Sequence, residues 1–172
     1  YLEKNRYDIV LTGSIVTHYK WMKWLTKTVR LYNPKSIIIV GNSVAGSIPK
    51  LFLSNSDADI AIMGEGELST NETIFKILSD EDIRNIEGIA YKKTNGTIKV
   101  NPKRKGLKKL DDFPMINWEP FKTEEYFTKS YAAAKAVDDT KMRVMPVVTA
   151  RGCAFRCTFC HFVFWNDPYR YR

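Results

Sequence analysis

The chain has 172 residues, 44% of them hydrophobic and 13% aromatic, and it carries a formal net charge of +8. It contains no run of about 18 apolar residues and no signal-peptide pattern, so we expect a cytoplasmic protein without a membrane partner. Much of the positive charge lies in residues 103–109, which is typical of a solvated linker, so we do not expect a nucleic-acid partner. Because the chain begins at Tyr1 instead of Met, we expect either a fragment or a trimmed chain.

The first third of the chain alternates apolar runs with amphipathic stretches. Residues 8–11 predict a buried strand that ends in a Thr-Gly-Ser loop. A helix capped by Thr17 is expected to follow, up to the Asn-Pro pair that ends it. Within this helix Trp21, Leu25 and Val29 are four residues apart and predict the buried face.

Two further strand–helix pairs follow. Residues 36–40 are uniformly apolar and β-branched, as expected for a parallel strand that is covered on both faces. A loop at 41–43 and a short helix at 48–53 come next. Residues 59–63 predict a third strand, from which a Gly-Glu-Gly-Glu loop leads into a helix up to about residue 78. The side chains expected to be buried on that helix are Leu68, Ile74, Ile77 and Leu78.

This order of elements predicts an α/β fold with a Rossmann-like parallel sheet and right-handed crossovers. In such sheets ligands bind outside the carboxyl ends of the strands, where we expect three loops, at residues 12–17, 41–47 and 64–67. Glu65 and Glu67 lie at a helix start, so capping and interaction with the helix dipole are favoured over a pair of catalytic carboxylates.

The pattern changes after residue 80. Two β-rich runs, 88–91 and 97–100, flank Asn95-Gly96 and predict a hairpin with a tight turn. Beyond it we expect an extended segment at 110–114, a linker with one or two short helices at 115–140, and a last strand at 144–149. The predicted domains are a Rossmann-like domain over 1–80, a hairpin and linker over 81–143, and the start of a further domain over 144–172.

All three cysteines lie within eight residues, at Cys153, Cys157 and Cys160, just after the last predicted strand. An odd, clustered set argues against disulfides and for a metal site or a reactive thiol. Three thiolates at C-x3-C-x2-C spacing can each bind one iron of a cubane cluster. Because a fourth cysteine is missing, one iron is left open to another ligand, and the amino and carboxylate groups of S-adenosylmethionine can occupy such a position.

Two alternatives stay open for the cysteines. A structural zinc site could take His161 or His18 as its fourth ligand, but zinc sites usually come as paired knuckles and a second pair is missing here. Three ordinary buried cysteines without a metal are the other alternative. The spacing favours the iron–sulfur cluster over both.

Residues 149–160 read TARGCAFRCTFC and resemble the cluster motif of the radical S-adenosylmethionine superfamily. The resemblance implies that the three cysteines hold a [4Fe-4S] cluster, which cleaves S-adenosylmethionine reductively to a 5′-deoxyadenosyl radical. It also implies that residues 144–149 form the first strand of a partial (β/α)6 barrel. By the same resemblance Phe159 lies against the adenine end of S-adenosylmethionine, and a core aromatic is the equally open interpretation of this residue.

The rest of the chain resembles the amino-terminal module of the subgroup with a cobalamin-binding, Rossmann-like domain. The matching pieces, in order, are Asn33-Pro34, the Gly41 loop, Asp59 before Gly64-Glu65-Gly66-Glu67, Gly88-Ile89-Ala90-Tyr91 and Leu110-Asp111-Asp112-Phe113-Pro114. The resemblance implies an enzyme of methyl transfer or radical rearrangement, with a small-molecule or metabolite substrate and an electron donor such as flavodoxin or ferredoxin. Because only the start of the barrel is included, we do not expect the printed chain to be catalytically complete.

Cobalamin is implied for this subgroup, yet the Asp-x-His-x-x-Gly motif whose histidine ligates cobalt in some members is missing from this sequence. Three interpretations are open: the motif precedes Tyr1, cobalamin binds without a histidine ligand, or cobalamin is not bound. By resemblance, the residues at the position of a cobalamin tail are Ser14, Thr17, Gly41 and Gly64; ordinary turn and cap roles are the alternative. Asn42 adds a side chain where the family often has a second glycine.

Two other function classes are kept as alternatives. One is a methylthiotransferase-like radical enzyme that acts on RNA, but such enzymes carry three further cysteines in the amino-terminal domain, and residues 1–152 contain none. The other is a non-enzymatic binding module with a zinc knuckle.

Overall fold

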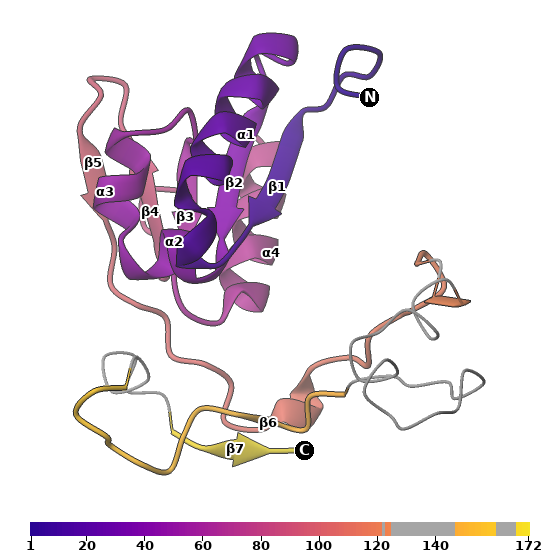
Figure 1. Cartoon of the computed structure of the whole chain (residues 1–172), viewed down its shortest axis with the longest axis vertical. Helices are drawn as coiled ribbons and strands as arrows, with labels where there is room; N and C mark the ends of the chain where they lie inside the picture. Colours follow the sequence, from indigo (N-terminus) through magenta and orange to yellow (C-terminus); the bar gives the residue numbers. More distant parts are fainter. Residues whose placement is uncertain (122, 125–146, 161–167) are drawn as a thin grey trace. The chain divides into compact units, whose positions relative to one another are not determined.

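The computed structural model describes residues 1–121, 123–124, 147–160 and 168–172 (Figure 1). The chain divides into two compact units, Tyr1–Gly106 and Leu107–Arg172, which are described separately below. No helix in the described ranges is long and apolar enough to cross a bilayer.

A five-stranded sheet forms the centre of the first unit. Its strands, in spatial order, are β1 (Ile9–Gly13), β2 (Ile37–Gly41), β3 (Ile60–Ile62), β4 (Ile89–Lys92) and β5 (Ile98–Val100). The first three strands run parallel and confirm the predicted α/β sheet, with Ile9 opposite Ile37 and Gly13 opposite Gly41.

The predicted hairpin forms, but it belongs to the same sheet. β4 pairs antiparallel with β3, and β5 pairs antiparallel with β4 across a turn in which Gly96 has a φ of +80°. The sheet is therefore mixed instead of purely parallel, and the expected domain boundary near residue 80 falls inside the first unit. A direct antiparallel return requires no crossover helix, which is why the sheet can continue beyond the last strand–helix pair.

Four helices cover the two faces of this sheet (Figure 1). They are α1 (Tyr19–Tyr32), which follows the 3-10 turn η1 (Val16–His18), α2 (Asn42–Ser47), α3 (Pro49–Ser54) and α4 (Gly66–Leu78). Ile38 and Val40 of β2 pack in the core under α1, α2 and α3, whereas Ile37 and Ile39 pack with the core on the α4 side. This alternation follows from the period of two in a strand. The loop expected at 41–43 is wrong, because α2 starts directly after Gly41.

The buried faces of the two long helices differ from the predicted ones. On α1 Val29 is buried as predicted, and Leu25 is partly buried against the core. Trp21, however, is 49% exposed, and Met22 and Thr26 are buried in its place. Thr26 is small enough to let neighbouring residues approach α1 closely. Its hydroxyl donates to the Lys23 carbonyl oxygen at 3.0 Å. On α4 only Ser69 and Thr73 are buried; Leu68, Ile74 and Ile77 are half-buried, and Leu78 is exposed. The fully buried residues of α4 are thus small and polar, while Ile74 and Ile77 pack partly buried against the core of the sheet.

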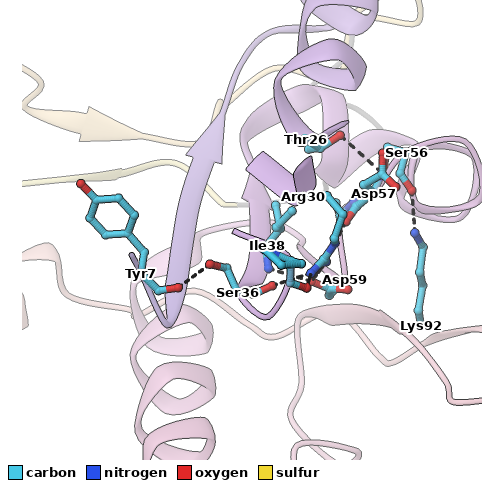
Figure 2. A network of polar contacts seen from close by, with 11 residues as sticks. Tyr7, Thr26, Arg30, Ser36, Ile38, Ser56, Asp57, Asp59 and Lys92 are labelled. Carbon is cyan, nitrogen blue, oxygen red and sulfur yellow. Dashed lines mark hydrogen bonds and ion pairs between the residues drawn. The ribbon is translucent and has the colours of Figure 1, made fainter. Parts of the chain in front are cut away.

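A polar network ties α1 to the amino ends of β2 and β3 (Figure 2). The Asp59 carboxylate accepts hydrogen bonds from Arg30 Nη2 at 2.6 Å and from the Ile38 amide at 2.8 Å. Arg30 Nη1 also donates to the Ser36 carbonyl oxygen at 2.8 Å. Lys92 Nζ lies at the edge of the network and donates to the Ser56 carbonyl oxygen at 2.6 Å. Desolvation by burial lowers the pKa of Lys92 below the usual value for a lysine.

In the second unit the described secondary structure is short. A 3-10 turn, η2 (Leu110–Asp112), stands in the segment that was expected to be extended. β6 (Ala150–Arg151) pairs antiparallel with β7 (Arg170–Tyr171). Residues 147–149 have no regular secondary structure, so the strand expected at 144–149 is wrong there; residues 144–146 and most of the expected linker helices lie outside the described residues.

Candidate functional site

A small cavity of about 150 Å³ lies at the carboxyl ends of the parallel strands, where such sheets bind ligands. Its apolar walls come from Leu11 of β1, Ile39 and Val40 of β2 and Ile62 of β3. A pocket for a complete drug-sized ligand usually has a volume of about 300–1,000 Å³. This cavity therefore has room for one ring-sized group of a larger ligand.

Three polar side chains line the same cavity, from Thr12, Asn42 and Thr70. Among the described residues the Thr12 hydroxyl has only the Met22 thioether as a partner, at 4.0 Å, and sulfur is a weak acceptor. Asn42 Oδ1 accepts the Ser43 amide at 2.6 Å, which fixes the amide orientation and leaves Nδ2 as a donor. An apolar pocket with a few polar groups that can still form hydrogen bonds is typical of a ligand site.

Two glycines of the cavity differ in what the fold demands of them. Gly64 has a φ of +78°, and a Cβ there would lie 3.0 Å from the Lys103 side chain. Gly41 has an extended backbone, with a φ of −134°, and a Cβ there would meet nothing within 4 Å. The fold therefore explains the glycine at position 64 but not the one at position 41. A ligand that approaches the backbone closely would explain the latter.

The next residue, Asn42, has a backbone conformation that is uncommon outside glycine. Its φ of +64° places it in the left-handed region, which asparagine tolerates better than most residues. Such outliers gather at binding sites, where the surrounding structure holds them in place. Asn42 is thus a functional candidate on backbone geometry as well as on its position in the cavity wall.

Ser14 and Thr17, the other two residues expected at a cofactor tail, do not line the cavity. Ser14 Oγ is 2.7 Å from His18 Nδ1, and the Ser14 carbonyl oxygen accepts the Val44 amide at 3.1 Å. Thr17 is exposed in η1. The residues that sequence reasoning missed are Thr12 and Thr70. Thr12 could have been found from its place near the end of an apolar strand, and Thr70 from its position one helical turn after Gly66.

The two glutamates at the start of α4 hold different positions relative to the helix. Glu65 is the residue before the helix, and its carboxylate forms no capping hydrogen bond, so the expected capping role is wrong. Glu67 lies in the first helical turn, where a negative charge interacts favourably with the helix dipole.

The cysteine loop follows β6 in the second unit. Gly152 has a φ of +75°, and the Cys160 amide donates to the Cys157 carbonyl oxygen at 3.0 Å, which closes a tight turn. Cys153 and Cys160 are half-buried and Cys157 is exposed, with all three thiols free of disulfides. The Phe155 amide donates to Cys153 Sγ at 3.4 Å. All three sulfurs are thus available as ligands.

In the described part of the chain, no three His, Cys, Asp or Glu side chains are close enough to hold one metal ion. The loop would therefore have to close further for the three thiols to reach one cluster, as is usual because metal binding and local folding are coupled. The donor set itself fits, because thiolates are the ligands that iron–sulfur clusters take. Phe159 is 90% exposed, and His161 lies outside the described residues.

No known protein-family profile matches the chain. Among curated proteins it is 27% identical to a cytidylyl-2-hydroxyethylphosphonate methyltransferase of Streptomyces wedmorensis, over 86% of this chain and 31% of the relative. It is also 25% identical to an uncharacterized methyltransferase of Pyrococcus horikoshii, over 79% of this chain and 27% of the relative. The chain thus spans less than a third of the length of these relatives.

Solved structures share its fold. The radical S-adenosylmethionine methyltransferase TsrM from Kitasatospora setae, with cobalamin and a [4Fe-4S] cluster bound, matches with a TM-score of 0.53 and 14% identity, over 62% of this chain and 20% of that chain. The cobalamin-dependent S-adenosylmethionine radical enzyme OxsB matches with a TM-score of 0.54 and 22% identity, over 95% of this chain and 21% of that chain. The Rossmann-like α/β architecture is therefore shared with cobalamin-dependent radical enzymes.

Proposed function

We propose that this chain is the amino-terminal part of a cobalamin-dependent radical S-adenosylmethionine methyltransferase. The observation that carries the proposal is the C-x3-C-x2-C loop at Cys153, Cys157 and Cys160, which follows an α/β unit whose fold such enzymes share. Two methyltransferases among the relatives support methyl transfer as the reaction. The expected substrate is a small molecule, and the expected electron donor is a flavodoxin or ferredoxin.

In this proposal the three cysteines each bind one iron of a [4Fe-4S] cluster and leave the fourth iron to S-adenosylmethionine. When bound, the cluster supplies the electron for reductive chemistry on S-adenosylmethionine. Arg151 precedes the loop, with its guanidinium carbon 5.2 Å from the centre of the Phe113 ring. Arg151 thus places a fixed positive charge close in sequence to the three cysteines.

The cavity at the carboxyl ends of β1, β2 and β3 takes the nucleotide tail of the corrinoid in this proposal. Gly41 lets that tail approach the backbone, and the apolar walls exclude water from its ring. The Thr12 and Thr70 hydroxyls and the Asn42 amide line the cavity and offer the hydrogen-bonding groups. Ser14 and Thr17 have no assigned contact with the tail.

Anaerobic reconstitution of the 172-residue chain with iron and sulfide tests the cluster. We expect about four irons per chain and a broad charge-transfer absorption, and we expect Cys157→Ala to lose most of both. His18→Ala serves as the control, because His18 is a ligand only in the zinc alternative. A chain that takes up one zinc instead, or that loses its metal in His18→Ala, would contradict the proposal.

Gly41→Ala tests the cavity. The added methyl group meets nothing in the fold, so the free energy of unfolding is expected to stay within about 0.5 kcal/mol of the original value. Corrinoid affinity, measured by absorbance titration, is expected to fall about tenfold, because one extra methyl group in a close-fitting pocket excludes its ligand. Gly96→Ala adds the same group at the hairpin turn and should leave affinity unchanged. An unchanged affinity in Gly41→Ala would remove the cavity from the proposed site.

A further inference from the structure

The cavity at the strand ends has an unequal distribution of polar and apolar groups. Four aliphatic side chains form its walls, and polar groups are contributed by Thr12, Asn42 and Thr70. The Thr12 hydroxyl is engaged only by a thioether, and Asn42 Nδ2 has no hydrogen-bond partner in the described part of the chain. A ring that enters this cavity therefore meets at least one amide donor and two hydroxyl groups.

Asn42 is exposed, so a ring that fills the cavity displaces water from its amide, and a purely apolar ring would then leave the polar groups of the cavity without partners. A site that can form hydrogen bonds with its ligand rejects an analogue that lacks the matching groups, because the polar groups of the site then stay unpaired. Asparagine is especially suited to adenine, since its amide can donate to a ring nitrogen and accept from the exocyclic amino group. The second lone pair of Asn42 Oδ1 is available for that role, because the Ser43 amide occupies only one.

We propose that Asn42 is a specificity-determining residue that selects corrinoids whose tail carries a purine base over those that carry dimethylbenzimidazole. This inference rests on the proposed function, because it concerns the same cavity. Dimethylbenzimidazole presents methyl groups at the edge where adenine presents ring nitrogens and an amino group. The methyl groups would face the Asn42 amide, while adenine satisfies it.

The backbone of Asn42 makes the assignment testable without loss of the fold. With a φ of +64°, position 42 suits glycine, so Asn42→Gly removes the amide and relieves the left-handed strain. Asp80 is the other non-glycine residue with a positive φ in the described ranges, at +55°, and it is exposed. Asp80 does not line the cavity. Asp80→Gly is therefore a matched control, because it relieves the same left-handed backbone strain at a position outside the cavity.

The experiment is a set of binding titrations on the full 172-residue chain with three probes. These are an adenine-containing cobamide, the dimethylbenzimidazole-containing cobalamin, and cobinamide, which has no base. We expect the adenine form to bind about tenfold more tightly than cobalamin, and cobinamide to bind more weakly than both. In Asn42→Gly the preference between the two bases should fall to within about twofold, whereas Asp80→Gly should retain it.

The possible failures separate the inference from the function on which it rests. Equal binding of the two base-containing probes, or a preference that survives in Asn42→Gly, overturns the role of Asn42 and leaves corrinoid binding intact. If cobinamide binds as tightly as the two base-containing probes, then no base enters the cavity, and the inference is overturned as well. If none of the three probes binds, both the inference and the cobalamin part of the proposed function are overturned.

Discussion

Gly88→Ala is expected to lower the free energy of unfolding of the first unit by about 3 kcal/mol. Gly88 has a φ of +78°, where an L side chain is strained. A Cβ there would lie 2.5 Å from Ser69 Oγ and 3.2 Å from the Arg104 side chain. Ser69 cannot move away easily, because it is fully buried and its hydroxyl donates to the Glu87 carbonyl oxygen at 2.8 Å. Denaturant unfolding monitored by circular dichroism measures the change.

Gly96→Ala separates the two causes of this effect. Gly96 has almost the same φ, +80°, but a Cβ there would meet nothing within 4 Å. The free energy of unfolding of this variant should therefore fall only by the cost of a side chain at positive φ, about 1 kcal/mol. Equal losses in Gly88→Ala and Gly96→Ala would contradict the tight packing of Gly88 against α4.

Asp59→Ala is expected to destabilise the first unit by about 2 kcal/mol. The Asp59 carboxylate accepts from Arg30 Nη2 and from the Ile38 amide (Figure 2), and Ile38 is fully buried. Without the carboxylate, the amide of the buried Ile38 loses its hydrogen-bond partner, and an unpaired buried donor is costly. The Arg30–Asp59 ion pair itself adds less, since both side chains are about one third exposed. Unfolding midpoints in urea measure the loss.

The exposed pair Asp82–Arg84 provides the control for this prediction. Its atoms are 2.9 Å apart, but the Arg84 side chain is largely in solvent. The Arg84 backbone amide and guanidinium hold the pKa of Asp82 below its usual value. Asp82→Ala removes an ion pair without uncovering a buried donor, so little change in stability is expected. If both variants lose the same stability, then the buried amide of Ile38 is not the cause.

Local patterns predicted the elements of the first unit well. The apolar β-branched run in β2 and the Asn95-Gly96 turn each specify their conformation through nearby residues, and both form as expected. The loop predicted at 64–67 is shorter, because α4 already begins at Gly66. The cysteine spacing is equally local, so it could be read from the sequence, whereas the closure of the loop around a cluster could not.

The choice between two apolar faces could not be made from periodicity. On α1, Trp21 and Leu25 have the spacing of a buried face, and so do Met22 and Val29. The contact that decides is tertiary: the Asp57 amide lies 3.4 Å from the Thr26 hydroxyl, which places the chain before β3 against that side of α1. The bulky Trp21 and Trp24 then stay at the surface.

In the candidate site, too, some features follow from the local sequence and others from tertiary contacts. Gly41 and Gly64 line the cavity, as their places at the end of β2 and after β3 suggest, but Ser14 does not. After β1 the chain turns into η1, and the Val44 amide binds the Ser14 carbonyl oxygen. That contact between distant residues holds Ser14 beside α2 and away from the cavity, and no pattern within the first loop could have shown it.

The network around Asp59 and the cavity around Asn42 lie at opposite ends of β2 and β3. The five residues of β2 separate them by roughly 16 Å, at the usual rise of about 3.3 Å per residue. Substitutions that far apart, with no shared partner, have additive effects on the free energy of unfolding. Natural or laboratory evolution can therefore vary the residues at one end to change which ligand is held, while the other end keeps the domain folded.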